Sequence, residues 1–392
     1  MQIGLLGKTN VGKSTFFSAA TELVVPIANH PFTTIKPNVG ITYVRVNCVC
    51  KEFKVKDNPI HSICINGNRF IPIKLIDIAG LVPGAHKGRG LGNKFLDDAR
   101  QADALIHVID AAGATDSEGR SCAAGSNDPL EDLKFVEEEF DLWLASIISK
   151  DWSKIAREVE HKIKKLEELL AEKLSGLSIR EELIVDVLKN TKKKPIEWDE
   201  NDIISFAKRL RMISKPIVVA ANKADIKQAE INIQRLKEYT LAIPCSAEAE
   251  LLLKLASKKG IIEYLAGDSK FTIKDTNLTK EQMAALDKTK AFLDKWGSTG
   301  IQDVINTIVL KVLKMIVVYP VEDVEKLSDK KGNILPDAYL MKEGSTAKDL
   351  AYTIHTDLAE NFIYALDVRN KQRVGADYKL KNNDIIQIVA SR

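Results

Sequence analysis

A glycine-rich loop near the beginning of the sequence has the residue types and the spacing that bind a polyphosphate. Residues 7–14 read G-K-T-N-V-G-K-S and match the pattern G-x-x-x-x-G-K-[ST] at every required position. Backbone N–H groups of such a loop, with the N-terminus of the following helix, surround phosphate oxygens. We expect Lys13 to reach the β- and γ-phosphates and the Ser14 hydroxyl to ligate Mg²⁺. The residues of this region predicted to contact a nucleotide are Asn10, Val11, Gly12, Lys13, Ser14 and Thr15.

A second motif, D-I-A-G at residues 77–80, follows the apolar run 73–76. A carboxylate at the end of a strand can hold a metal ion, so Asp77 joins Ser14 as a candidate Mg²⁺ ligand. Gly80 has no side chain, and its N–H can therefore approach a γ-phosphate closely. The motif is short, but its place after the glycine-rich loop favours this role.

A third motif, N-K-A-D at residues 222–225, follows the apolar run 217–221. The Asp225 carboxylate can accept two hydrogen bonds from the N1–H and 2-amino groups of guanine. Adenine lacks this pair of donors, so a buried site built for guanine rejects it. We expect Asn222 to brace the loop and Lys223 to lie along the base.

A fourth and shorter motif, C-S-A-E, occupies residues 245–248. The Ala247 N–H can donate a hydrogen bond to the guanine O6, and Ser246 is included with it as a nucleotide-binding residue. In this order, the four motifs predict binding of GTP and GDP with Mg²⁺ and hydrolysis of GTP.

The motifs lie at the ends of apolar runs that alternate with helical segments. Such runs are typical of parallel strands covered on both faces, and the alternation predicts a doubly wound α/β sheet of the P-loop NTPase kind. About a hundred residues separate Asp110 from Pro216, although a crossover needs only about a dozen. Three- and four-residue apolar spacing over 130–148 and 152–174 predicts a helical insertion there, as a hairpin or a short coiled coil.

After about residue 315 the pattern changes to strands at 316–321 and 385–389 with a short helix at 349–355, which indicates a small α+β domain. The predicted division is a nucleotide-binding domain with C-terminal helices at 1–125 and 213–315, a helical insertion at 126–212, and a C-terminal domain at 316–392.

The composition is that of a chain with two or three domains. It has 392 residues, of which 45% are hydrophobic, and a net charge of +3 that neither demands nor excludes a nucleic-acid partner. The apolar runs are too short to span a bilayer, and no signal-peptide pattern precedes the first run, so we expect a cytoplasmic protein without a membrane partner. Five cysteines are a poor disulfide framework and favour reduced thiols.

One group of cysteines could hold a metal ion. Cys48, Cys50, His61 and Cys64 have the residue types of a zinc site in a β-ribbon. Their spacing fits no established zinc pattern, so buried thiols without metal are the favoured interpretation.

With these motifs placed, the chain resembles the Obg-related P-loop GTPases, and most closely their YchF-like branch. Residues 31–40, P-F-T-T-I-K-P-N-V-G, look like the switch I segment of that family. The resemblance implies that Thr34, with Thr33 as the alternative, closes over Mg²⁺ and the γ-phosphate. Together with Lys13 and Gly80, whose roles follow from their own motifs, Thr34 makes up the expected catalytic set.

The resemblance extends over nearly the whole chain. Residues 77–86 and 88–93 are similar to the glycine-rich switch II of the family, and the last ~77 residues look like a TGS domain, a ubiquitin-like β-grasp (α+β) module. Membership would imply association with ribosomes or RNA.

The base-recognition motif departs from the branch pattern. The best-known YchF-like proteins lack the aspartate of N-K-x-D and are similar to adenine-nucleotide hydrolases, whereas Asp225 is present here. The residues favour GTP. Two alternatives stay open: an ATP-preferring hydrolase in stress signalling, and a nucleotide-gated binding module with vestigial hydrolysis.

The residue that orients the attacking water is not evident. Ras-like GTPases place a glutamine after D-x-x-G, where this chain has Leu81. One alternative is a K⁺ ion held by Asn10, since several potassium-dependent GTPases have an asparagine in this loop. The others are His86 in the glycine-rich stretch, or a partner such as the ribosome that completes the site.

Overall fold

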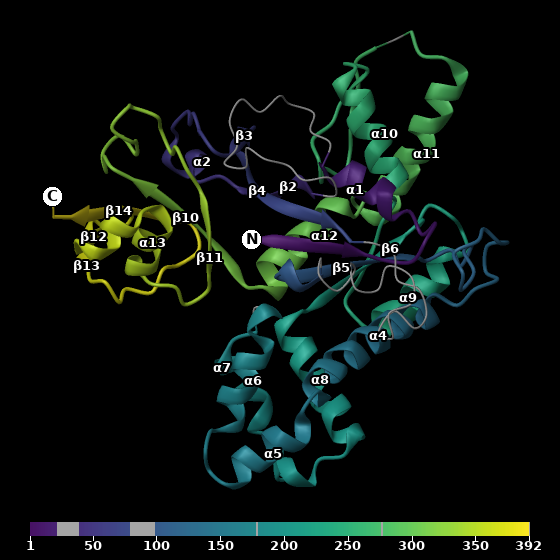
Figure 1. Ribbon diagram of the computed structural model, residues 1–392. Helices are drawn as coiled ribbons and strands as arrows, with labels where there is room; N and C mark the ends of the chain where they lie inside the picture. Colours follow the sequence, from purple (N-terminus) through teal and green to yellow (C-terminus); the bar gives the residue numbers. More distant parts are fainter. Residues whose placement is uncertain (22–38, 79–98, 178, 276, 392) are drawn as a thin grey trace. The chain divides into compact units, whose positions relative to one another are not determined.

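The computed structural model describes residues 1–21, 39–78, 99–177, 179–275 and 277–391 (Figure 1). The predicted switch residues Thr34, Gly80, Leu81 and His86 lie outside these ranges, as does Thr33. The described residues form two compact units. The first comprises 1–21, 39–40 and 74–304, and the second comprises 41–73 and 305–391.

The first unit is built on a parallel sheet in the order β4-β1-β5-β6-β7. Its strands are β1 (Gln2–Leu6), the end of β4 (Asn68–Asp77), β5 (Ala104–Asp110), β6 (Ile217–Asn222) and β7 (Ala242–Pro244). Every residue of β5 is buried, as expected for a central strand covered on both faces. The predicted strands at the P-loop, at Asp77 and before Asn222 are therefore confirmed.

Helices cover both faces of this sheet, which confirms the doubly wound arrangement. On one face lie α1 (Lys13–Thr21) and α10 (Ala247–Lys258), which pack together, and on the other lie α4 (Pro129–Ser149) and α9 (Ala229–Tyr239) (Figure 1). The remaining elements of the first unit beyond β7 are β8 (Ile262–Glu263), β9 (Thr272–Ile273), α11 (Lys280–Trp296) and most of α12 (Ile301–Asn306).

The helical insertion folds around its own apolar core. After α4 come α5 (Trp152–Glu160), α6 (Leu166–Leu174), α7 (Glu181–Leu188) and α8 (Glu200–Ser214). The rings of Trp152 and Trp198 stack at 5.0 Å between centroids, and Phe206 lies 5.3 Å from Trp198. The segment 152–174, expected as one helix, is broken because Lys162 has a left-handed backbone (φ 56°). The insertion is thus a bundle of several helices rather than the expected hairpin or short coiled coil.

The second unit contains a five-stranded sheet in the order β11-β10-β14-β12-β13, with β10 and β14 parallel. Its elements are β10 (Met315–Val321), β11 (Tyr339–Lys342), α13 (Ala347–Ile354), α14 (Thr356–Glu360), β12 (Phe362–Asp367), β13 (Gln372–Val374) and β14 (Asp384–Ala390). Thr346 caps α13 in a capping box with Asp349. This is the expected C-terminal α+β module.

A segment from the first quarter of the chain belongs to the second unit. It carries most of β2 (Val39–Asn47), α2 (Cys50–Phe53), β3 (Ile63–Ile65) and the first part of β4. Its buried residues share an apolar cluster with Val317, Tyr319 and Ile385 of β10 and β14. The predicted division into three domains stays a prediction, because the two compact units do not test its boundaries.

Candidate nucleotide-binding site

The loop between β1 and α1 adopts a path that only glycine can follow at two positions. Gly7 has φ +155° and Gly12 has φ +90°. A Cβ atom on Gly7 would lie 2.6 Å from the Val108 carbonyl oxygen, and one on Gly12 would collide with the Asn222 amide. The loop is therefore packed against β5 and the end of β6, because both glycines lack a side chain.

Lys13 and Asp77 form an ion pair at the start of α1. Both side chains are only partly exposed, at 14% and 25%. Ser14 is exposed beside them on the first turn of the helix, and Thr15 is partly buried. The Ser14 hydroxyl and the Asp77 carboxylate are hard oxygen donors of the type that Mg²⁺ takes, so the donor set fits the predicted metal.

Lys8 has a different role, although it lies in the same loop. It is 5% exposed, and its Nζ donates to the Thr115 carbonyl oxygen at 3.0 Å and to Asp132 Oδ1 at 2.7 Å. Burial raises the pKa of Asp132, while Lys8 acts in the opposite direction. The pair fastens the phosphate loop to α4. Sequence reasoning missed it, since Lys8 occupies a free position of the motif and Asp132 is 124 residues away.

Asn10 also makes a structural contact. Its Nδ2 donates to the Gly119 carbonyl oxygen at 2.7 Å, and its own carbonyl oxygen accepts from Thr115 Oγ1 at 3.4 Å. Its backbone is left-handed (φ 62°). These contacts attach the loop after β5 to the phosphate loop, so Asn10 shapes the phosphate loop.

Asn222 connects three loops of the site. Its Nδ2 donates to the Val11 carbonyl oxygen at 2.9 Å, and its Oδ1 accepts from the Ala247 N–H at 3.0 Å. Asn222 is 3% exposed, so both hydrogen bonds are shielded from water. The bracing that we expected within the base loop thus reaches the phosphate loop as well. The Ala247 N–H must share or release this bond before it can donate to a guanine O6.

Lys223 is held by a carboxylate that sequence reasoning did not assign. Asp110 ends β5, is 1% exposed, and accepts from Lys223 Nζ at 2.7 Å and from Thr115 Oγ1 at 2.5 Å. Lys223 has a left-handed backbone (φ 59°). The position of Asp110 at the end of a buried strand next to β6 is the signal that could have identified it.

Asp225 has a hydrogen-bond donor on each carboxylate oxygen. Oδ1 accepts from Ser246 Oγ at 3.0 Å, and Oδ2 accepts from Lys288 Nζ of α11 at 2.9 Å. Asp225 is 16% exposed, whereas Lys288 is 68% exposed. The hydrogen bond to Asp225 raises the pKa of Lys288. A guanine base must displace Lys288 from Oδ2, and this exposed lysine is easy to displace.

Three family models match successive parts of the chain. Residues 2–137 match the 50S ribosome-binding GTPase model, and residues 220–323 match the Obg-like GTPase YGR210-like, G4 motif-containing domain. Residues 330–390 match the TGS domain. The matched ranges include the phosphate loop, the base loop and the C-terminal module.

Three relatives match most of the chain. A GTP-binding protein of Methanocaldococcus jannaschii is 54% identical over 99% of both chains. One of Schizosaccharomyces pombe is 35% identical over 90% of this chain and 89% of its own. The ribosome-binding ATPase YchF of Bacillus subtilis is 30% identical over 68% of both.

Solved structures agree with the fold. A GTP-binding protein from Pyrococcus horikoshii superposes with a TM-score of 0.80 at 41% identity, and covers 100% of both chains. The YchF GTPase of Schizosaccharomyces pombe, at 22% identity, gives 0.60 over 99% of this chain and 97% of its own. The chain belongs to the Obg-like P-loop family of GTP-binding proteins, in its YchF-like branch, and carries a C-terminal TGS domain.

Proposed function

We propose that this protein binds GTP with Mg²⁺ and hydrolyses it to GDP and phosphate in a switch cycle. The observation that carries the proposal is the Asp225 carboxylate. Ser246 fixes one of its oxygens, and Asn222 ties its loop to the phosphate loop. A carboxylate in this place can accept hydrogen bonds from the N1–H and 2-amino groups of guanine, whereas adenine lacks this pair of donors.

The phosphate end of the site needs few rearrangements to receive the nucleotide. Lys13 is held close to the phosphate loop by Asp77, and both side chains are partly exposed. On binding, Lys13 leaves Asp77 for the β- and γ-phosphates, and Asp77 with Ser14 becomes available to the metal. When bound, Mg²⁺ neutralises the charge that develops on the transferred phosphoryl group. Thr34 and Gly80 complete the proposed catalytic set by closing over the γ-phosphate.

Without a partner, the protein hydrolyses GTP slowly, because the leucine at position 81 cannot orient the attacking water. A ribosome or RNA partner supplies the missing stimulation. The matches to a 50S ribosome-binding GTPase model and to relatives named ribosome-binding ATPases support this partner. K⁺ is the second proposed stimulant. Asn10 commits its Nδ2 to Gly119, so Oδ1 is the atom that would ligate the ion.

Membrane attachment is not part of the proposal. None of the helices in the described ranges combines the length and the apolar character that a bilayer span needs. The expected cytoplasmic location stays a prediction.

Phosphate release from GTP and from ATP, with and without ribosomes, tests the proposed reaction. We expect GTP to be the better substrate, and ribosomes to raise its turnover. Lys13→Ala should lower turnover by roughly 10²-fold or more, because it removes charge stabilisation at the transferred phosphoryl group. Faster turnover of ATP would instead identify the ATP-preferring alternative, and turnover that no partner or ion raises would identify the binding module.

A further inference from the structure

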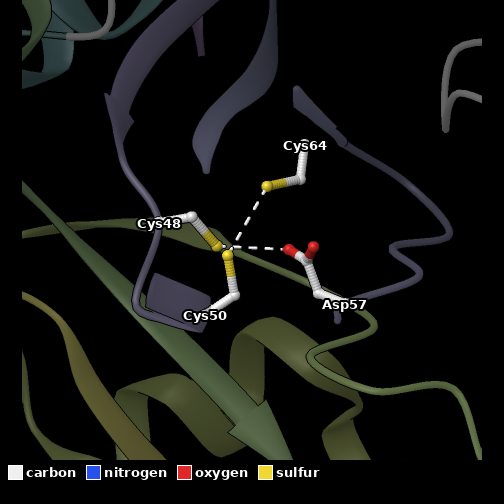
Figure 2. Close-up of side chains that lie close together, drawn as sticks. All are labelled: Cys48, Cys50, Asp57 and Cys64. Carbon is white, nitrogen blue, oxygen red and sulfur yellow. Dashed lines mark hydrogen bonds between the residues drawn. The ribbon is translucent and has the colours of Figure 1, made fainter. Parts of the chain in front are cut away.

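Three cysteines and one aspartate of the second unit direct their side chains toward one point (Figure 2). They come from four consecutive pieces of the chain. Cys48 follows β2, Cys50 begins α2, Asp57 lies in the loop after α2, and Cys64 is the central residue of β3. One ligand atom from each of the four residues lies within 4.8 Å of the other three.

The separations are close to those of ligands around a tetrahedral metal. Two thiolates bound to zinc at about 2.3 Å lie about 3.8 Å apart at the tetrahedral angle. The Cys50 and Cys64 sulfurs are 3.8 Å apart. The Cys48 sulfur lies 3.2 Å from Asp57 Oδ2, somewhat closer than a bound sulfur and oxygen would be. Small side-chain movements would therefore give a metal-bound geometry.

Two of the four ligands are buried, and Asp57 and Cys64 are partly buried. Cys48 is 3% and Cys50 is 6% exposed, and both pack in one apolar cluster with Val317 and Tyr319 of β10. The Asp57 side chain is 9% exposed. Packing of this kind holds the cysteine side chains in place.

A fully buried arginine lies beside the cluster. Arg69 Nη2 donates to Asp57 Oδ2 at 2.9 Å, to the Cys48 sulfur at 3.5 Å and to the Leu335 carbonyl oxygen at 3.0 Å. Its Nη1 donates to Ser62 Oγ at 2.9 Å. A divalent ion with three thiolates and one carboxylate carries two negative charges, one of which Arg69 offsets. Hydrogen-bond donors that contact metal ligands in this way also hold those ligands in orientation.

We propose that Cys48, Cys50, Asp57 and Cys64 bind one structural zinc ion. Three soft thiolates with one carboxylate suit zinc better than magnesium or calcium, which take oxygen ligands. Four protein ligands leave no open position, which is the mark of a structural rather than a catalytic site. The zinc ion would link residues along the segment from the end of β2 to β3, and so hold this segment in the apolar core that it shares with β10.

The ligand set differs from the zinc set considered from the sequence, where thiols without metal were the favoured interpretation. His61 takes no part, because its Nδ1 lies 2.6 Å from Asp337 Oδ1 and its side chain is 49% exposed. Asp57 takes the fourth position, for which the residue types in the sequence suggested His61. Matched variants can therefore separate the two sets.

Metal content of the full-length protein tests the proposal. The protein is purified without chelators or a histidine tag, and zinc and iron are measured by inductively coupled plasma mass spectrometry. We expect about one zinc per chain, released in full when a mercurial reagent modifies the thiols of the wild-type protein. Cobalt(II) added to the metal-free protein should give the thiolate-to-metal charge-transfer band and tetrahedral d–d bands.

Variants then identify the ligands. Cys64→Ser should lose the zinc, Asp57→Cys should keep it as a fourth thiolate, and His61→Ala and Cys122→Ser should keep it unchanged. If a serine variant fails to fold, the mercurial release and the cobalt spectrum of the wild-type protein still show whether the thiols bind the metal. The proposal is overturned if zinc stays far below stoichiometry and cobalt gives no thiolate band. It is overturned equally by zinc retained in Cys64→Ser, by stoichiometric iron in place of zinc, or by a Cys50–Cys64 disulfide in the purified protein.

Discussion

Replacement of Asp225 by asparagine should change the base that this site prefers. The asparagine side chain would keep one oxygen acceptor but present an amide donor to the 2-amino group of guanine, where two donors would then face each other. Xanthine carries an oxygen at this position and keeps N1–H, so it complements an asparagine. Asp225→Asn should therefore bind xanthosine nucleotides better than guanosine nucleotides.

The magnitude follows from the contacts that guanine would make. Two hydrogen bonds to a carboxylate contribute about 1.5–3 kcal/mol each. Guanine must first break the ion pair between the exposed Lys288 and Asp225, which costs only about 0–1 kcal/mol because surface ion pairs are weak. The net loss in Asp225→Asn is therefore about 2–6 kcal/mol, which corresponds to a roughly 30- to 10⁴-fold weaker affinity for GDP.

The assay is displacement of a fluorescent guanine nucleotide by unlabelled GDP, ADP and xanthosine diphosphate. Asp287→Asn is the matched control, because Asp287 is exposed on the same helix as Lys288 and should leave all three affinities unchanged. An Asp225→Asn protein that binds GDP as tightly as the wild type would refute the reasoning, since guanine would then be recognised elsewhere or not at all.

Four further outcomes follow from the same geometry. Lys288→Ala should tighten GDP binding by up to a few-fold, because the competing ion pair contributes only about 0–1 kcal/mol, and weaker binding in the same titration would contradict that competition. Asn222→Ala should destabilise the protein by about 2–4 kcal/mol in urea unfolding, since it leaves two buried backbone groups without a partner; a loss below the scatter of surface variants would count against the brace. Burial lowers the pKa of His107 to about 3, whereas the unfolded chain takes up a proton there near pH 6.5. The free energy of unfolding should therefore fall by about 3 kcal/mol between pH 7 and pH 4 from this residue alone. His107→Phe should flatten that slope, and an identical slope would show that other groups cause it. Sodium in place of potassium should lower GTP turnover about tenfold if Asn10 Oδ1 holds the ion, whereas equal turnover would leave Asn10 a purely structural role.

The parts of the fold that the sequence predicts are those with local signals. The phosphate loop and the base loop each carry a fixed spacing at the end of an apolar run, so the strands that precede them were predictable. The capping box of Thr279 with Gln282 likewise marks the start of α11 within four residues.

The parts that escaped prediction depend on contacts between distant residues. Lys8 with Asp132 and Lys288 with Asp225 are ordinary charges in the sequence, and only the packed helices bring them together. The break at Lys162 overrides an apolar spacing that alone would continue a helix. Nothing in the sequence places residues 41–73 in the same unit as 305–391, since the apolar cluster joins residues far apart in the chain.

The most direct test of the central claim is a competition between GDP and ADP for the wild-type protein in the presence of Mg²⁺. The Asp225 carboxylate predicts that GDP binds at least roughly 10²-fold more tightly than ADP. Equal affinities, or tighter binding of ADP, would contradict the account, because the base loop would then not select guanine.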